Sequence, residues 1–490
     1  MRVPTAQPER FPLVPEVEIL PAAGATESSA EPAPASEARV PLTGRKLWEP
    51  HWDFAFLGLL GYIVVEYTRL PAMFPVLQPL ALGKVTVVLS ALGWVFLPKA
   101  HRFHQTWTRR IDTTLLVLLG ATLVSAFFAE FPDPAWKAFL DAVRWGVVYF
   151  IISRLLVGGW RLRTFCFLWL LANLKLAQFV VRSYQSLHAS GMYDEMQLIT
   201  NGIGAGSTGF FSNSADLGVA MCVIWPVAVC LLFSKPRPIW KVLLWANAIL
   251  CLGAILVCGS RGAVVGAAAV AVIAFFKSPK KAAALIMAVF LLIGIWLFLP
   301  AASKERFHSA ENPDQDRTAH ARLLLWKAGL RMFRDNPILG VGPNNYPLVR
   351  WNHYPLGDPK LPEGVTVPHS SYIEAISELG LSGSIPFLLL WVTFFQLNSA
   401  TRRQVLSLGP EYKRSFEYCL AMGLDLGMIG YMGSGAFVAV LWYPHIFVLL
   451  GLSVGLYSVA MKKTAPTAAQ ERVRERPGAA WQVERRCGDT

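Results

Sequence analysis

The sequence predicts an all-α integral membrane protein with about twelve transmembrane helices and one long loop on the outer side of the bilayer. Hydrophobic residues make up 54% of the 490 residues and charged residues only 16%, whereas about a quarter of the residues in a soluble domain are charged. Apolar runs of roughly 20 residues recur along the chain. Basic residues are concentrated in every second connection between these runs, which is typical of cytoplasmic loops.

The apolar runs define the predicted spans in chain order. A helix needs about 20 apolar residues to cross a hydrocarbon core of roughly 30 Å. The first run is the weakest, since its uninterrupted apolar part extends only from Phe54 to Val65. The predicted spans are residues 50–67, 75–98, 113–129, 139–158, 162–182, 213–234, 239–258, 261–276, 282–300, 371–396, 417–433 and 436–461.

The net charge of +13 would make nucleic acid the first partner to consider for a soluble protein. In this chain, the five connections on one side of the bilayer hold 17 basic residues and one clear acid, Glu411. The short connections on the other side hold three basic residues. Because cytoplasmic loops carry such an excess of Lys and Arg, both termini are predicted to be cytoplasmic, and we expect no nucleic-acid partner.

The two ends of the chain differ in composition from the membrane region. Residues 1–46 contain eight prolines and no apolar run of the kind found in a signal peptide, so they are predicted to form a disordered cytoplasmic segment. Residues 47–461 form the predicted membrane domain, and residues 462–490 a basic cytoplasmic tail. Six of the seven cysteines lie within apolar runs and are predicted to be small core residues.

Two longer segments face outward in this topology, residues 183–212 and residues 301–370. The second contains a predicted amphipathic helix that ends at Asp335-Asn336-Pro337, because proline disfavours α geometry in the preceding residue. We expect this helix to lie along the membrane surface, with its basic face towards phosphate headgroups or an anionic ligand. Its predicted apolar face consists of Leu323, Trp326, Leu330 and Phe333, and its opposite face of Lys327, Arg331 and Arg334.

Three basic residues on the outer side are candidate site residues. Arg261 lies where one predicted span ends and the next begins, Arg322 opens the amphipathic helix, and His369 immediately precedes the tenth span. Guanidinium groups donate two parallel hydrogen bonds to phosphate oxygens. A neutral histidine, with a pKa of about 6.5, accepts a proton from a hydroxyl group. Two arginines and one base therefore suffice to handle a diphosphate leaving group, and we expect no metal ion or other cofactor.

Each of these residues also has an ordinary structural explanation. Arg261 fits an interfacial anchor, Arg322 a solvated surface charge, and His369 a cap of the tenth span. Residues 314–316 form an Asp-Gln-Asp triplet of the type that binds metal in some sugar transferases, but we expect no metal at this lone tripeptide. Asn213 is predicted to be a helix N-cap.

Several short motifs occur in an order that resembles one known family. Gly259-Ser260-Arg261-Gly262-Ala263 is similar to its SRG element, and Arg322 with Trp326 to its R-x-x-x-W element. The stretch from Asn336 to Gly342 follows its P-(x)2-G-x-G pattern, and the stretch from His369 to Gly383 is similar to its H-N-x-x-L, E-x-G-x-x-G pattern. The family is the bacterial O-antigen ligase and Wzy-type polymerase superfamily, and the resemblance covers roughly residues 205–390.

The resemblance implies a membrane glycosyltransferase of O-antigen, capsule or exopolysaccharide biosynthesis. Such enzymes move a glycan from an undecaprenyl-diphosphate carrier to an acceptor hydroxyl, on another glycan or on a lipid A core, at the periplasmic face of the bacterial inner membrane. In the family, the arginines that correspond to Arg261 and Arg322 hold the diphosphate, and the histidine that corresponds to His369 activates the acceptor. The chain departs from the family at Ser370, where an asparagine is usual.

Two other functions are compatible with the sequence. A transporter or flippase of lipid-linked oligosaccharide would use charged residues within the spans, and Lys84, Arg144, Lys175 and Asp425 are candidates, although Arg144 and Asp141 are spaced to pair with each other. A scaffold for other polysaccharide assembly proteins would use residues 1–46 as a docking arm. Gly262 and Gly266 form a small-xxx-small face that favours close helix packing in either case.

Overall fold

A computed structural model of the chain describes residues 52–68, 74–96, 106–191, 213–278, 281, 317–358, 364 and 366–464. All of these residues belong to one compact unit, which comprises Pro41–Thr490. Helices and turns make up the described residues, and no strand occurs among them. The predicted segments 1–46 and 282–300, the triplet 314–316 and most of the tail 462–490 lie outside the described residues.

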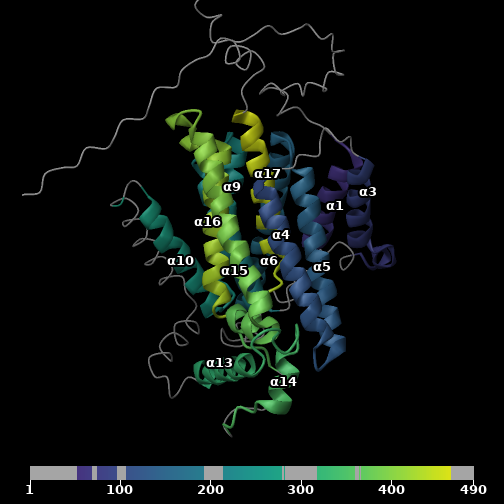
Figure 1. Cartoon of the computed structure of the whole chain (residues 1–490). Coiled ribbons are helices and arrows are strands. Elements are labelled where there is room, and N and C mark those ends of the chain that lie inside the picture. Colours follow the sequence, from purple (N-terminus) through teal and green to yellow (C-terminus); the bar gives the residue numbers. More distant parts are fainter. Residues whose placement is uncertain are drawn as a thin grey trace, which may run out of the picture. The chain divides into compact units, whose positions relative to one another are not determined.

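Eleven helices of the described residues form an up-and-down bundle, and two further helices cover one end of it (Figure 1). The bundle helices are α1 (Phe54–Thr68), α3 (Leu82–Phe96), α4 (Thr106–Phe127), α5 (Pro132–Leu155), α6 (Gly159–Ala189), α8 (Ser214–Leu232), α9 (Pro238–Val257), α10 (Arg261–Lys277), α15 (Ser371–Leu406), α16 (Phe416–Gly435) and α17 (Pro444–Thr464). The covering helices are α13 (Arg317–Asp335) and α14 (Tyr346–His353), and 3-10 turns occur at η2 (Pro75–Leu80) and η5 (Pro410–Arg414).

Each predicted span other than 282–300 overlaps one of these helices. Within the described part of the chain, seven helices are long and apolar enough to cross a bilayer, and the protein is a multi-pass membrane protein. The total of twelve spans stays a prediction.

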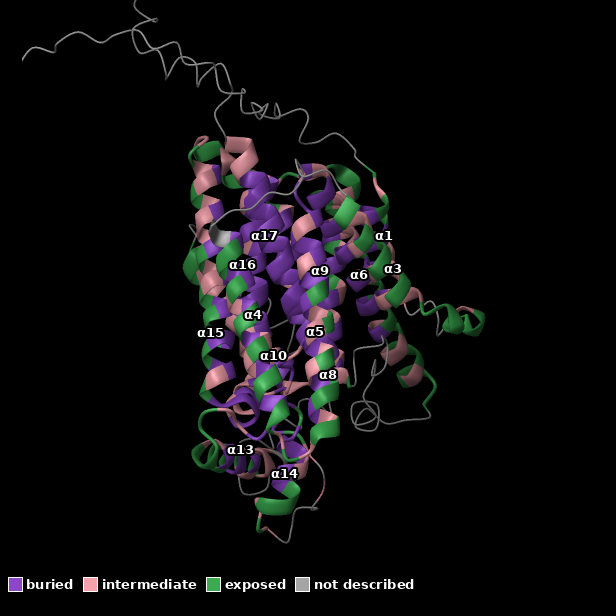
Figure 2. Ribbon diagram, turned by 45° about the vertical axis from the view of Figure 1, so that its right-hand side comes forward, coloured by how far each residue is buried: buried purple, intermediate pink, exposed green. Residues whose placement is uncertain are grey.

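Burial of the helices separates a bundle centre from a lipid-facing surface (Figure 2). Helix α17 is buried along nearly its whole length, as expected for a helix that is apolar on all sides and surrounded by other helices. Helix α15 instead exposes an apolar stripe at helical spacing, which is typical of contact with lipid. This stripe consists of Leu381, Ile385, Leu388, Leu389 and Val392.

The last predicted span, 436–461, is wrong at its start. Residues 436–443 form turns, and α17 begins only at Pro444. The reason is a set of hydrogen bonds that an apolar run does not reveal. The Val440 N–H donates to Ser371 Oγ at 2.9 Å, and the Val440 carbonyl accepts from the Tyr431 hydroxyl at 3.0 Å. The turn 436–443 is thereby attached to the start of α15.

Small residues allow α10 and α16 to pack closely, as predicted. A Cβ atom on Gly266 would lie 2.0 Å from Ser434 Oγ and 2.7 Å from the Gly430 carbonyl oxygen. A Cβ atom on Gly262 would lie 3.0 Å from Phe437 Cβ. Any larger side chain at these two positions would push the helices apart.

Two charged residues within the described part of the predicted spans, Arg144 and Asp425, are paired. Arg144 contacts Asp141 at 2.9 Å, as its spacing predicts. Asp425 accepts hydrogen bonds from Arg402 at 2.5 Å and Asn398 at 3.0 Å. Arg144 and Asp425, two of the four residues that the transporter hypothesis would use, are therefore paired. The six described cysteines are free, and five of them are buried, which confirms their predicted role as core residues.

Candidate functional site

Helices α13 and α14 enclose a small apolar core of their own at the end of the bundle where α15 begins (Figure 1). The Tyr346 hydroxyl donates to the Leu325 carbonyl at 2.6 Å and thereby joins the two helices. The buried residues of this core are Leu325, Met332, Val341, Tyr346 and Val349.

The predicted apolar face of α13 is wrong in part. Leu323 and Leu330 are 52% and 49% exposed, and they share the exposed face with Lys327, Arg331 and Arg334. The helix carries a second apolar stripe, Leu325, Ala328 and Met332, and this stripe is the one buried against the rest of the protein. The pattern in the sequence contains both stripes and does not indicate which one meets the core. An exposed face of leucines and basic residues suits a membrane surface.

A glycine in α15 allows the helix backbone to form hydrogen bonds with the turn that follows α13. Gly380 has φ 56° and ψ −155°, a conformation essentially restricted to glycine. The backbone carbonyls of Ser377 and Glu378 accept instead from the N–H groups of Val341 and Gly342, both at 2.9 Å. The turn after α13 therefore occupies acceptors that would otherwise serve the helix itself.

The backbone N–H groups of α15 that follow Gly380 donate to the same turn. The Leu381 N–H donates to the Pro337 carbonyl at 2.8 Å, and the Ser382 N–H donates to the Ile338 carbonyl at 3.0 Å. A Cβ atom on Gly340 would lie 2.4 Å from the backbone carbon of Glu378. Only glycine permits this approach, which explains why the glycines of the two motifs occur together.

The Glu378 side chain closes the next part of this turn. Its carboxylate accepts from the Asn344 N–H at 2.7 Å and from the Tyr346 N–H at 3.2 Å. Asn345 links the turn to the start of α5 by accepting from the Phe131 N–H at 2.9 Å and donating to the Phe131 carbonyl at 3.0 Å. Ser125 of α4 donates to the Glu378 carbonyl at 3.0 Å. These hydrogen bonds join α4, α5, α15 and the turn after α13 into one platform at this end of the bundle.

His369 lies on this platform immediately before α15, in a left-handed backbone conformation with φ 49°. The Trp326 indole of α13 donates to the Pro368 carbonyl at 3.0 Å. On the other side, Ser371 Oγ donates to the Val438 carbonyl at 2.9 Å. The histidine backbone is therefore held from two directions, and a strained residue held in this way is common at functional sites. Ser370 is the N-cap of α15. It is buried, and its side chain makes no capping hydrogen bond.

Arg322 and Arg261 lie at the same end of the bundle as this histidine, and Phe437 lies near residues of both arginine-bearing helices. Arg322 lies one helical turn before Trp326, whose ring is 6.2 Å from the Phe437 ring. Phe437 also contacts Gly262, the residue after Arg261 at the first position of α10. The N-cap of α10 is Ser260, which accepts from the Ala263 N–H at 3.3 Å. The structure thus brings all three predicted site residues to one end of the bundle, around Phe437 and the turn 436–443.

The electrostatic environment favours a neutral histidine. Desolvation of the ring by the surrounding protein, followed by repulsion from the Arg322 guanidinium, lowers the pKa of His369 from its ordinary value. Part of the residue nevertheless remains exposed to solvent. An accessible neutral imidazole next to a cation is able to accept a proton from a hydroxyl group while the cation holds an anion.

A pH dependence follows from this lowered pKa. A neutral base is lost when it is protonated, so kcat/KM should fall at acidic pH. Because the pKa of His369 is lowered, this fall should begin at a pH below 6.5, the ordinary pKa of histidine. Removing the Arg322 charge should raise the pKa of His369, because protonation is then no longer opposed. Titration of labelled histidine by NMR in wild type and in Arg322→Gln measures the shift directly. A lower or unchanged pKa in Arg322→Gln would contradict it.

Sequence reasoning missed the residues that position the site. Glu374 and Glu378 lie one turn apart on α15, and Glu374 Oε2 accepts from the Leu441 N–H at 3.3 Å while Glu378 binds the turn after α13. The sequence did contain a signal for these two residues, because two carboxylates four residues apart are unusual in an otherwise apolar span. Trp326 occurs in the sequence motif, but its hydrogen bond to Pro368 depends on the fold.

No three His, Cys, Asp or Glu side chains within the described ranges are grouped so that they could hold a metal ion. The triplet 314–316 lies outside those ranges. Asn213 caps α8 by accepting from the Asp216 N–H at 2.9 Å, which confirms the prediction for this residue.

Comparison with known proteins identifies the segment that contains this site. Residues 246–388 match a family described as O-antigen ligase. The matched segment includes Arg261, Arg322 and His369 together with both glycine motifs. No curated protein matches the chain.

Proposed function

We propose, from the match of residues 246–388 to the O-antigen ligase family, that the protein transfers a glycan from an undecaprenyl-diphosphate carrier to an acceptor hydroxyl at the periplasmic face of the inner membrane. The observation that carries the proposal is the position of His369, held by Trp326 and Ser371 beside the charge of Arg322. The products would serve O-antigen, capsule or exopolysaccharide biosynthesis.

The chemistry divides between the three residues. The acceptor oxygen forms a bond to the sugar carbon while its proton passes to the His369 imidazole. The bond between that carbon and the phosphate oxygen breaks, and the diphosphate leaves with the electron pair. Arg261 and Arg322 stabilise the growing negative charge through charge-assisted hydrogen bonds. Near the low-dielectric bilayer such bonds are stronger than in water.

Removing either arginine is expected to slow transfer. Arg261→Ala and Arg322→Ala should each lower kcat/KM by about 10²-fold or more, since each charge-assisted hydrogen bond contributes roughly 1.5 to 3 kcal/mol and each guanidinium makes two. Product formed from a lipid-linked donor in reconstituted vesicles measures the effect. Arg→Lys variants should recover part of the rate, because the charge returns without the bidentate geometry.

A matched control is Arg331→Ala, because Arg331 is an exposed basic residue on the same helix as Arg322. This control should retain nearly full activity. If Arg261→Ala and Arg322→Ala also retained full activity while inserted and folded, the assignment of the diphosphate site would be wrong.

The transfer is proposed to need no metal ion. Product formation should therefore continue in EDTA. Loss of activity in EDTA that Mg²⁺ or Mn²⁺ restores would instead support a metal site at residues 314–316.

Polymerase and ligase differ in the acceptor. Lipopolysaccharide from a strain that lacks the protein separates the two: core with one repeat indicates a polymerase, and bare core with normal carrier-linked polymer indicates a ligase. Unchanged bands indicate a capsule or exopolysaccharide pathway. Transbilayer movement of labelled lipid-linked oligosaccharide by the purified protein alone would favour the flippase alternative. If deletion of residues 1–46 impaired function as much as substitution of His369, a scaffold would be favoured.

A further inference from the structure

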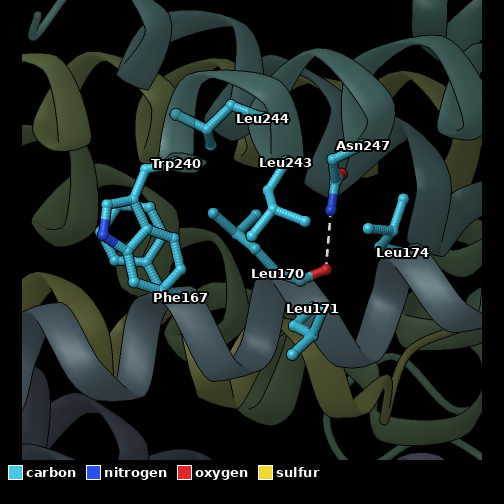
Figure 3. Close-up of a pocket in the computed structure, with 8 residues that line it drawn as sticks. All are labelled: Phe167, Leu170, Leu171, Leu174, Trp240, Leu243, Leu244 and Asn247. Atoms are coloured by element: carbon cyan, nitrogen blue, oxygen red, sulfur yellow. Dashed lines mark hydrogen bonds between the residues drawn. The ribbon is translucent and has the colours of Figure 1, made fainter. Parts of the chain in front are cut away.

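A shallow apolar groove lies between α6 and α9, away from the candidate site (Figure 3). Trp240 in the groove lies 17 residues before Val257, where α9 ends near Arg261, which corresponds to about 25 Å along the helix. Leucines from both helices line the groove, and Asn247 occupies its far end, where its amide donates to the Leu170 carbonyl at 2.7 Å. The leucines include Leu170, Leu171 and Leu174 of α6 and Leu243 and Leu244 of α9.

The groove faces the lipid. The outer surface of α9 beside it is exposed and apolar, with Ile239, Val242, Trp245 and Ile249 between 51% and 65% exposed. In a multi-pass membrane protein such a surface contacts acyl chains. The walls of the groove are almost entirely apolar, so an acyl chain is the ligand that they suit.

Aromatic rings close the groove at the end where both helices begin. Phe167 and Trp240 stack with their ring centroids 4.2 Å apart, and Figure 3 shows the two rings beside each other at one end of the row of leucines. Tryptophan is typical of the level at which the hydrocarbon core meets the headgroups. The headgroup of a lipid in this groove would therefore lie beyond Trp240.

Basic residues occupy that position on both helices. Arg163 lies one turn before Phe167, and its guanidinium is 5.0 Å from the centre of the Phe416 ring. Arg237 is the N-cap of α9, and Lys241 follows one turn later, its N–H donating to the Arg237 carbonyl at 2.9 Å. All three are exposed, and the charges of Arg163 and Arg237 repel each other.

Glu417 attracts the guanidinium of Arg163 and also pairs with Lys463 at 3.2 Å, so one carboxylate serves two cations at this end of the bundle. Helices α6 and α9 both run from the basic end of the bundle towards the outer end, so their side chains follow the same order: basic, aromatic, then leucine. This order matches that of a phospholipid, in which a phosphate precedes an acyl chain.

We propose that this groove binds an anionic phospholipid of the cytoplasmic leaflet, with the phosphate between Arg163 and Arg237 and one acyl chain along the leucines. The bound lipid would relieve the repulsion between the two arginines and cover the seam between α6 and α9. The proposal does not depend on the glycosyltransferase activity.

Native mass spectrometry of the full-length protein tests the proposal, with phosphatidylglycerol and phosphatidylcholine of identical acyl chains as probes. Wild type is expected to retain one phosphatidylglycerol more tightly than phosphatidylcholine. The double variant Arg163→Gln/Arg237→Gln should bind phosphatidylglycerol at least about tenfold more weakly, because a phosphate contact of each guanidinium is lost. The control Arg403→Gln/Lys413→Gln removes the same charge from the same end of the bundle and should bind as wild type does.

A second variant tests the acyl-chain part. Leu171→Trp places a bulky ring in the groove and leaves the arginines intact, and it should weaken the binding of phosphatidylglycerol. Equal binding of both lipids by wild type, or equal losses in the double variant and its control, would overturn the headgroup assignment. Unchanged binding by Leu171→Trp would overturn the placement of the chain in the groove.

Discussion

Replacing His369 by asparagine is expected to reduce turnover by about 10²- to 10⁴-fold, the usual contribution of a general base. Asparagine is the appropriate replacement because His369 has φ 49°, and asparagine adopts this left-handed conformation more readily than most residues. The variant should therefore insert and fold normally while lacking a base. Initial rates with a lipid-linked donor in vesicles measure the loss.

The matched control for this variant is His353→Asn. His353 also lies in the outer segment, but it is exposed and pairs with Glu130 at 2.9 Å, away from Trp326 and the turn 436–443. This control is expected to keep nearly wild-type turnover. If His369→Asn retained more than a tenth of wild-type turnover, His369 would not be the base, and an acceptor activated by another group would have to be sought.

Replacing Gly380 by alanine is expected to detach the turn that follows α13 from α15. A Cβ atom on Gly380 would lie 2.5 Å from the Ile338 carbonyl oxygen and 2.7 Å from the Gly340 nitrogen. The backbone conformation adds a further cost of roughly 1 to 3 kcal/mol for a residue other than glycine. The turn must therefore move away, and the four hydrogen bonds it exchanges with α15 are lost with it.

Hydrogen exchange measures this detachment residue by residue. The amides of Val341, Gly342, Leu381 and Ser382 should exchange faster in Gly380→Ala, and transfer activity should fall because His369 immediately precedes the same helix. Gly357→Ala is the control, because Gly357 also has a positive φ, 71°, but its Cβ atom would meet nothing within 4 Å. Equal protection of these four amides in wild type and Gly380→Ala would show that the four hydrogen bonds between the turn and α15 do not depend on Gly380.

The apolar runs predict helix positions well because the bilayer requires a continuous apolar stretch in each span. The prediction failed at 436–443 because an apolar run does not show where a helix starts. Those residues satisfy backbone groups through Tyr431 nearby and through Ser371 and Glu374, which lie more than 60 positions away in sequence. The buried face of α13 was also mispredicted, since the helix has two apolar stripes and only the packing partner selects one.

The sequence by itself determined the membrane character and the order of the helices, and it identified Arg261, Arg322 and His369 as the residues to examine. These are local properties: apolar length, loop charge and short motifs. Only the tertiary structure decided how the motifs act together. Gly340 and Gly380 permit the backbone hydrogen bonds between the turn after α13 and α15. Trp326 holds the residue before His369, and Phe437 lies between the two arginine-bearing helices. Such contacts join residues that lie as many as 253 positions apart, as Ser125 and Glu378 do, and steric fit in three dimensions selects them.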